Sequence, residues 1–395
     1  MPIALATVVP VANSVPPRFD AHHVKVILAA FARLRKYRMS TEPIRVQETH
    51  LQGNSVREVR LDKNQQREIR LKEIQDKRIS DLGLTIESSA LHRFVQQLYR
   101  ELERKRISKF HPVCYLSDEW GCPSGEPVIG IPFYLASPDL SLLEKGVNDL
   151  EDAREIMMYL RHEAGHAFNY AYRLHRTPQW KQLFGSFRRP YRDNYRPVPF
   201  SRNYVRHLAG WYAQKHPDED FAETFAVWLT PGSGWRKRYK NWGAIAKLRY
   251  MDRIARELGG IDPIRRRGVP DVTVDEMEST VGEFYRRTSE EVALGDLALD
   301  TDLRDIFNAS KRRKTSAPAQ NLLRQHRKSV VDKIAYWTGA QRPLVRKLIS
   351  VIEEKTAELG LLADRGRESE HLTNITVYAT ALAMNYVARG NFVQS

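Results

Sequence analysis

Residues 162–166 read His-Glu-Ala-Gly-His, and this H-E-x-x-H pattern lies inside a run with helical apolar spacing. His162 and His166 are four residues apart, so on a helix their side chains lie on one face and can bind a single metal ion. Glu163 follows the first histidine, where its carboxylate can act as general base on water at the metal. The pattern predicts a zinc site that performs hydrolysis. The alternative is a pair of histidines that are hydrogen-bonded within a core helix.

Zinc sites that perform catalysis have three protein ligands and an open fourth position. The metzincin pattern would supply a histidine at position 172 and a glycine at 169, but the chain has Tyr172 and Asn169, which excludes that class. The remaining candidates for a third ligand are His175, His207, Glu219 and Asp220.

The segment 216–229, which begins His-Pro-Asp-Glu-Asp, predicts a second helix. Glu219 and Glu223 are four residues apart and share one face of that helix. One carboxylate could bind zinc, and the other could accept a hydrogen bond from a ligand histidine. However, Pro217 followed by acidic residues in the first turn is also what an ordinary helix start contains. The residues alone leave both interpretations open.

H-E-x-x-H followed by a downstream helix with Glu-x-x-Ala-Glu at 219–223 resembles the pattern of the gluzincins. The stretch from about residue 75 to 260 is similar to a family of zinc-binding metallopeptidases, most of them bacterial. The resemblance implies a zinc-dependent peptidase that acts on a peptide or protein substrate. It also implies Glu219 as third ligand, with Glu223 as the hydrogen-bond partner of a ligand histidine. The matching segments are 81–99, 116–136, 159–176, 200–232 and 248–258.

Hydrolysis also needs a donor to the oxyanion that forms on the substrate carbonyl. A histidine beyond the third ligand, as in thermolysin-like gluzincins, is absent because the chain has no histidine between His216 and His326. Another gluzincin branch uses a tyrosine seven residues before its ligand glutamate, and Tyr212 stands at that position. The resemblance therefore implies Tyr212 as the donor, with His207 in reserve. The alternative for Tyr212 is an ordinary packing role beside Trp211.

The chain carries 63 Lys and Arg against 48 Asp and Glu, a net charge of +15. Much of the excess lies in residues 171–210, where aromatic residues alternate with basic ones and Asp193 is the one acidic residue. This texture is typical of a single-stranded nucleic-acid groove. It is also typical of a proline-rich loop whose aromatics pack and whose arginines face solvent, and we favour the loop. The alternative function is a nucleic-acid or partner-binding protein with a structural or inactive zinc site.

The elements that must position these residues are mostly helical. Helices are predicted at about 21–38, 56–80, 88–106, 149–174 and from Pro217 onward. Residues 111–116 and 128–135 are short, apolar and rich in β-formers, and they predict two strands with a turn between them. Pro132 favours an edge strand, which in the clan this chain resembles lies over the metal and pairs with substrate. The alternative, which we favour, is a plain sheet edge without that role. The predicted fold is α+β, mostly helical, with a zincin-like catalytic core, a small β-sheet and a C-terminal helical unit.

Changes in composition along the chain predict four regions. Residues 1–70 form an N-terminal arm and helices, and 71–260 form the zincin-like metallopeptidase domain. Residues 261–320 form a linker region with a basic cluster at 311–314, interpreted as a solvated turn rather than a nuclear signal. Residues 321–395 form the helical C-terminal unit.

Two further features concern the compartment. No apolar run approaches the length of a membrane span, and the N-terminus lacks the basic start and uninterrupted apolar stretch of a secretory signal. The two cysteines, Cys114 and Cys122, are too few for a disulfide framework and are predicted to be free thiols. The sequence predicts a cytoplasmic protein without a membrane partner.

Overall fold

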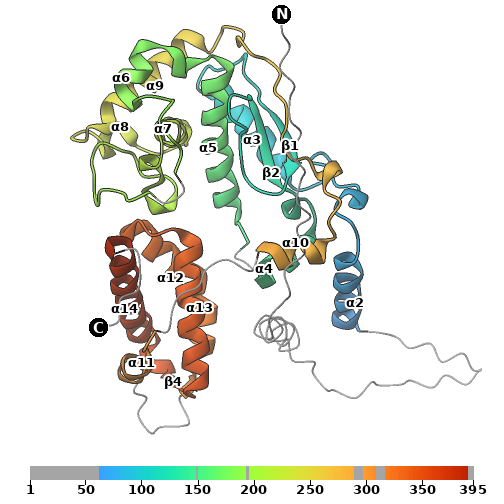
Figure 1. Ribbon diagram of the computed structural model, residues 1–395, viewed down its shortest axis with the longest axis vertical. Helices are drawn as coiled ribbons and strands as arrows, with labels where there is room; N and C mark the ends of the chain where they lie inside the picture. The colour runs from blue at the N-terminus through green and yellow to red at the C-terminus, as the bar shows by residue number, and fades with distance from the viewer. Residues whose placement is uncertain (1–61, 148–149, 193–194, 289–296, 308–315, 390–395) are drawn as a thin grey trace, which may run out of the picture. The chain divides into compact units, whose positions relative to one another are not determined.

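The structure is a computed structural model of the chain, and it describes residues 62–147, 150–192, 195–288, 297–307 and 316–389 (Figure 1). Contacts divide the chain into two units, 1–65 and 66–395, and the second contains the H-E-x-x-H pattern. The helix predicted at 21–38, the start of the helix predicted at 56–80 and the basic cluster at 311–314 lie outside the described residues.

The described chain is mostly helical, with two small sheets, which confirms the predicted α+β class. Helix α5, Ala153–Ala171, carries the H-E-x-x-H pattern, and helix α7, Pro217–Leu229, carries Glu219. A short 3₁₀ segment, η4, covers Ala209–Gln214. The other elements are α2 Lys63–Gln75, α3 Leu91–Arg104, β1 Val113–Ser117, β2 Val128–Pro132, α4 Pro138–Val147, α6 Pro178–Phe184, α8 Trp235–Arg238, α9 Ala244–Leu258, α10 Val281–Thr288, α11 Asp300–Ile306, β3 Ser316–Pro318, α12 Ala319–Thr338, α13 Arg342–Glu358, β4 Leu362–Asp364 and α14 Glu368–Arg389.

Helix α5 begins with a capping box at Asp152 and Glu155. Asp152 accepts hydrogen bonds from the backbone N–H groups of Arg154 and Glu155, and the Glu155 side chain accepts one from the Asp152 N–H. This capping box satisfies backbone donors that a helix otherwise leaves unpaired at its start. The cap fixes where the helix begins.

Helix α7 crosses α5 with the two backbones in contact. A methyl group on Gly165 would lie 2.8 Å from the Cα atom and 3.0 Å from the carbonyl oxygen of Ala222. Every residue of α7 is buried, including the carboxylates of its first turn. An ordinary helix start would leave those carboxylates in water, because burial of an unpaired charge is costly. These buried carboxylates therefore need partners within the protein.

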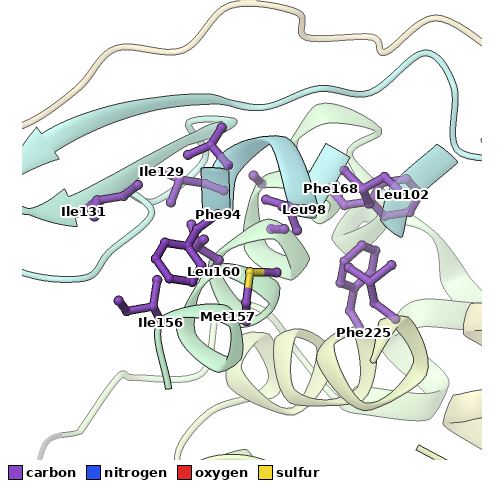
Figure 2. Close-up of a cluster of buried hydrophobic side chains, with 14 of the residues drawn as sticks. Phe94, Leu98, Leu102, Ile129, Ile131, Ile156, Met157, Leu160, Phe168 and Phe225 are labelled. Carbon is purple, nitrogen blue, oxygen red and sulfur yellow. The ribbon is translucent and has the colours of Figure 1, made fainter. Parts of the chain in front are cut away.

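Around this helix pair lies one hydrophobic core, whose buried members run from residue 79 to 285. Figure 2 shows its centre, where side chains from α3, β2, α5 and α7 meet. The labelled residues are Phe94, Leu98, Leu102, Ile129, Ile131, Ile156, Met157, Leu160, Phe168 and Phe225. The core thus covers one side of α5 and holds the helix that presents the histidines.

The first sheet differs from the prediction. Strands β1 and β2 pair in parallel, Val113 opposite Val128, so the connection is a crossover and not a tight turn. On the other edge of β2, Gly130 exchanges both of its backbone hydrogen bonds with Gly121. All five residues of β2 are buried. Strand β2 is thus an edge strand of a two-stranded sheet, as predicted, and the crossover segment contacts its free edge at Gly130. Pairing of this edge with substrate stays a prediction.

The C-terminal helices have a second hydrophobic core, with buried members from residue 299 to 383. Helix α12 packs against α13 and α14, and a two-stranded antiparallel sheet pairs Pro318 with Leu362. The four domain ranges predicted from composition stay a prediction. Both cysteines are free, as expected. No helix in the described part of the chain is long and apolar enough to cross a membrane.

A buried ion pair ties α3 to α5 and gives a first testable prediction. Arg161 donates two hydrogen bonds, of 2.7 and 2.8 Å, to the carboxylate of Glu101, whose side chain is 2% exposed. Glu101→Ala leaves the Arg161 charge buried without its partner, so we expect the free energy of unfolding to fall by about 3–5 kcal/mol. Chemical denaturation measures this. The matched control is Glu103→Ala on the same helix, where an exposed carboxylate faces His111, and its loss should stay below about 1 kcal/mol.

Candidate metal centre

Three side chains from α5 and α7 bring one donor atom each to a common point. The Nε2 atoms of His162 and His166 are 3.2 Å apart. The Oε2 atom of Glu219 lies 3.0 Å from the first and 3.2 Å from the second. All three side chains are buried, and they form the one group of potential metal ligands found among the described residues.

The spacing of these donor atoms fits a zinc ion. Tetrahedral zinc with bonds of about 2.0–2.1 Å places neighbouring ligand atoms about 3.3–3.4 Å apart, close to the distances found here. Two imidazole nitrogens and one carboxylate oxygen are also a donor set that zinc uses in catalytic sites. His162, His166 and Glu219 would therefore hold the ion, and a fourth position would stay open.

The second ring nitrogen of His162 lies 3.1 Å from Oε1 of Glu223. Glu223 is fully buried and also accepts hydrogen bonds from the backbone N–H groups of His207 and Leu208. With its carboxylate fixed in this way, Glu223 favours the tautomer in which Nδ1 of His162 carries the proton and Nε2 presents a lone pair. Glu223 thus lies where the resemblance implied.

His166 has a carboxylate partner that sequence reasoning missed. Its Nδ1 atom lies 2.9 Å from Oδ2 of Asp218. Asp218 in turn accepts hydrogen bonds from the side-chain amide of Asn169, at 2.7 Å, and from the hydroxyl of Tyr170. Each histidine therefore has its own buried carboxylate, and both ring orientations are fixed.

Asp218→Asn tests this arrangement. The amide can no longer hold the Nδ1 proton of His166 as a carboxylate does, so we expect zinc affinity to fall by about 10–100-fold. A competition titration with a chromophoric chelator measures the affinity. Asp81→Asn, at an exposed position, is the control and should leave the affinity unchanged. Equal zinc affinity in wild type and Asp218→Asn would contradict the role assigned to Asp218.

Glu163 differs from the other carboxylates of the centre. Its side chain is buried, yet within the described part of the chain it has no hydrogen-bond or ion-pair partner. Burial raises the pKa of its carboxyl, and the neighbouring histidines oppose that rise only in part. A buried carboxylate without a fixed partner is able to take up a proton, which is what a general base does.

Tyr212 reaches the centre together with a second tyrosine that sequence reasoning missed. The Tyr212 ring lies 5.7 Å from the ring of His162. The hydroxyl of Tyr191 donates to Oε1 of Glu219 at 2.6 Å and lies 3.1 Å from the hydroxyl of Tyr212. Burial and the charge of Glu219 raise the pKa of both hydroxyls, so both keep their protons. The site therefore contains two phenolic groups in one hydrogen-bonded chain.

The other candidate ligands lie outside the cluster. His207 places Nε2 2.9 Å from the carbonyl oxygen of Met158, and Asp220 pairs with Lys247 at 2.5 Å. The ring of His175 packs against Phe187 with centroids 4.4 Å apart. Burial lowers the pKa of His175 and of His207. Of the four candidates left open by the sequence, the structure brings Glu219 alone to His162 and His166.

The electrostatic balance of the centre favours a cation. Four buried carboxylates surround two imidazoles: Glu163, Asp218, Glu219 and Glu223. Burial opposes a charge on His162, but hydrogen bonds to Glu219 and Glu223 raise its pKa to about 9. The carboxylates thus favour positive charge at this point, and a divalent metal ion could supply it.

The protein thus has a mostly helical α+β fold in which an H-E-x-x-H helix is crossed by a second helix, and together they form a His–His–Glu cluster that could hold a metal ion. Residues 139–232 match the model of the family described as "Putative zinc-binding metallo-peptidase". The matched segment runs from α4 to just beyond α7 and contains all the donors named above. No curated protein and no solved structure matches the chain.

Proposed function

We propose that this protein is a zinc-dependent peptidase that hydrolyses peptide bonds, with Glu163 as general base. The observation that carries the proposal is the convergence of three buried donor atoms within 3.0–3.2 Å of one another beside an unpaired buried carboxylate. The family description supports the same class of activity.

A bound zinc ion would supply Lewis acidity to the substrate carbonyl and to water. Glu163 accepts the proton of the attacking water at its carboxylate and later delivers it to the leaving amine. Its raised pKa suits both steps, because the carboxyl holds the proton between them. Glu223 and Asp218 hold the protons on the Nδ1 atoms of His162 and His166, so the Nε2 lone pairs of both rings would be free to bind zinc.

Tyr212 donates its hydroxyl proton to the oxyanion on the substrate carbonyl. In the structure this proton points to Tyr191, whose own proton goes to Glu219, so the Tyr212 hydroxyl would turn from Tyr191 to the oxyanion when substrate binds. A hydroxyl that keeps its proton is the form that can donate, and the raised pKa of Tyr212 ensures this form.

The rival function, nucleic-acid or partner binding with a structural or inactive zinc site, rests on the basic segment 171–210. Its aromatic members Trp180 and Phe184 are buried in the core, whereas Arg188, Arg189 and Arg192 are exposed. The exposed arginines leave charge free for an anionic partner. However, a structural zinc normally closes its fourth position with protein, and the centre described above has three donors.

The test is metal analysis of the purified full chain together with a mass-spectrometric cleavage screen on a proteome-derived peptide library. We expect about one zinc ion per chain, cleavage that stops with a chelator, and recovery when zinc is added back. Absence of both zinc and cleavage would refute the proposal. Polynucleotide binding that falls steeply with salt and survives Glu163→Gln, without cleavage, would favour the rival function.

A further inference from the structure

The segment that carries Tyr212 has an unusual backbone. In η4, Gly210 and Trp211 both adopt left-handed conformations, with φ values of 80° and 49°. A bulky residue in this conformation is uncommon and persists only where its surroundings hold it. Trp211 is 4% exposed, so its ring is enclosed on nearly all sides. What encloses that ring therefore determines the direction in which the next residue, Tyr212, points.

The C-terminal helical unit supplies one wall of this enclosure. Gly339 ends α12 in a left-handed conformation, with φ 73°. A methyl group added to Gly339 would lie 2.6 Å from Cε3 and 2.8 Å from Cδ2 of Trp211. The glycine is therefore in contact with the indole face, and no other residue type fits there without moving the ring.

The same corner of the C-terminal unit also contacts the helix that carries the histidines. Lys328 of α12 lies 2.5 Å from Oε2 of Glu155, and Arg342 at the start of α13 lies 3.3 Å from Oε1. The Glu155 side chain is 3% exposed and belongs to the capping box of α5. The α12–α13 corner, residues 328–342, thus contacts η4, which carries Tyr212, and α5, which carries the two histidines.

We propose that the α12–α13 corner is a positioning element of the site: Gly339 seats the Trp211 ring, and this seat holds Tyr212 beside His162. The inference rests on the proposed function, because Tyr212 is there the donor to the oxyanion. Gly339 and Trp211 are positioning residues, since neither lies among the metal donors. The C-terminal unit then contributes to turnover and leaves zinc binding to α5 and α7.

The test compares Gly339→Ala with Gly360→Ala in the full chain. Gly360 also has a left-handed conformation, with φ 61°, in the same unit, but a methyl group there would have no neighbour within 4 Å. The two variants share the backbone strain and differ in the contact with Trp211. Hydrogen exchange by mass spectrometry measures the order of the segment around Trp211. Amides of residues 208–215 should exchange faster in Gly339→Ala and remain as in wild type in Gly360→Ala.

Kinetic measurements then test whether the contact between Gly339 and Trp211 acts through Tyr212. In Gly339→Ala we expect kcat to fall by about 10–100-fold with KM and zinc content unchanged, because a small displacement of a catalytic group suffices for such a loss. In a Tyr212→Phe background, Gly339→Ala should lower kcat no further. If Gly339→Ala does not fold, Trp211→Leu removes the other half of the contact and should give the same exchange and kcat changes.

Unchanged exchange of residues 208–215 in Gly339→Ala would overturn the inference, as would an equal loss of kcat in the Tyr212→Phe background. Exchange does not depend on hydrolysis. A wild-type chain that cleaves nothing would therefore refute the proposed function, while faster exchange in Gly339→Ala alone would still support the seat at Trp211.

Discussion

Glu163→Gln is expected to lower the rate of peptide hydrolysis by about 10²–10⁴-fold while the protein still binds about one zinc ion. Glutamine keeps the size of the side chain but cannot accept a proton from water. The change leaves His162, His166 and Glu219 in place, and in the described part of the chain Glu163 has no hydrogen-bond partner to lose. The loss should therefore fall on catalysis and spare both metal binding and folding.

The measurement combines kcat/KM on a peptide found in the cleavage screen with zinc content and thermal unfolding. Glu87→Gln removes an exposed carboxylate and should match wild type in all three. If Glu163→Gln hydrolyses the peptide at the wild-type rate, another group is the base. If it loses zinc as well, Glu163 is part of the metal centre and not a separate base.

His162→Ala is expected to abolish both zinc binding and the stabilisation that zinc provides. The change removes one of three donors and leaves Glu219 and Glu223 without the ring that both contact. A ligand present at about 100 times its dissociation constant stabilises the folded state by about 2.7 kcal/mol. Wild type should show a zinc-dependent rise of this order in the free energy of unfolding, and His162→Ala should show none.

Denaturation with and without added zinc, next to metal analysis, measures the difference. His175→Ala is the matched control, because this histidine lies close by in the chain, its ring packs on Phe187, and it is not one of the three donors. It should keep both the zinc and the zinc-dependent stabilisation. A His162→Ala protein that still binds one zinc ion would show that the metal site lies elsewhere.

Much of the centre could be predicted because it depends on spacing within single helices. Residues four apart share a helix face, which places His162 beside His166 and Glu219 beside Glu223. The resemblance to gluzincins then related the two helices to each other. What sequence spacing alone left open was which residue of α7 faces the histidines, and the structure brings Glu219 to them.

The residues that were missed come from contacts that local patterns do not encode. Asp218 stands where helix starts commonly carry an acidic residue, so nothing distinguished it from an ordinary first-turn carboxylate. Only the His166 Nδ1 atom, which needs an acceptor, could have pointed to it. Tyr191 lies in irregular chain 28 residues before Glu219, and no periodicity predicts where such a segment turns.

For the sheet of β1 and β2, the sequence predicts where the strands lie but not how they pair. The strands at 113–117 and 128–132 match the predicted positions, because short apolar runs rich in β-formers identify them. Their pairing depends on how residues 118–127 travel between them. That path brings Gly121 to the outer edge of β2, and a strand's own residues do not specify which neighbour will occupy each edge.

The contact between Gly165 and Ala222 links folding and chemistry at a point that touches no donor atom. Glycine is a weaker helix former than alanine by about 1 kcal/mol, so its presence in the middle of α5 lowers the intrinsic helix stability. In return the backbones of α5 and α7 meet without a side chain between them. The distance between the histidines and Glu219 is therefore set by van der Waals contact between two main chains. A larger residue at this crossing would change the metal affinity of the centre while every ligand stayed the same in the sequence.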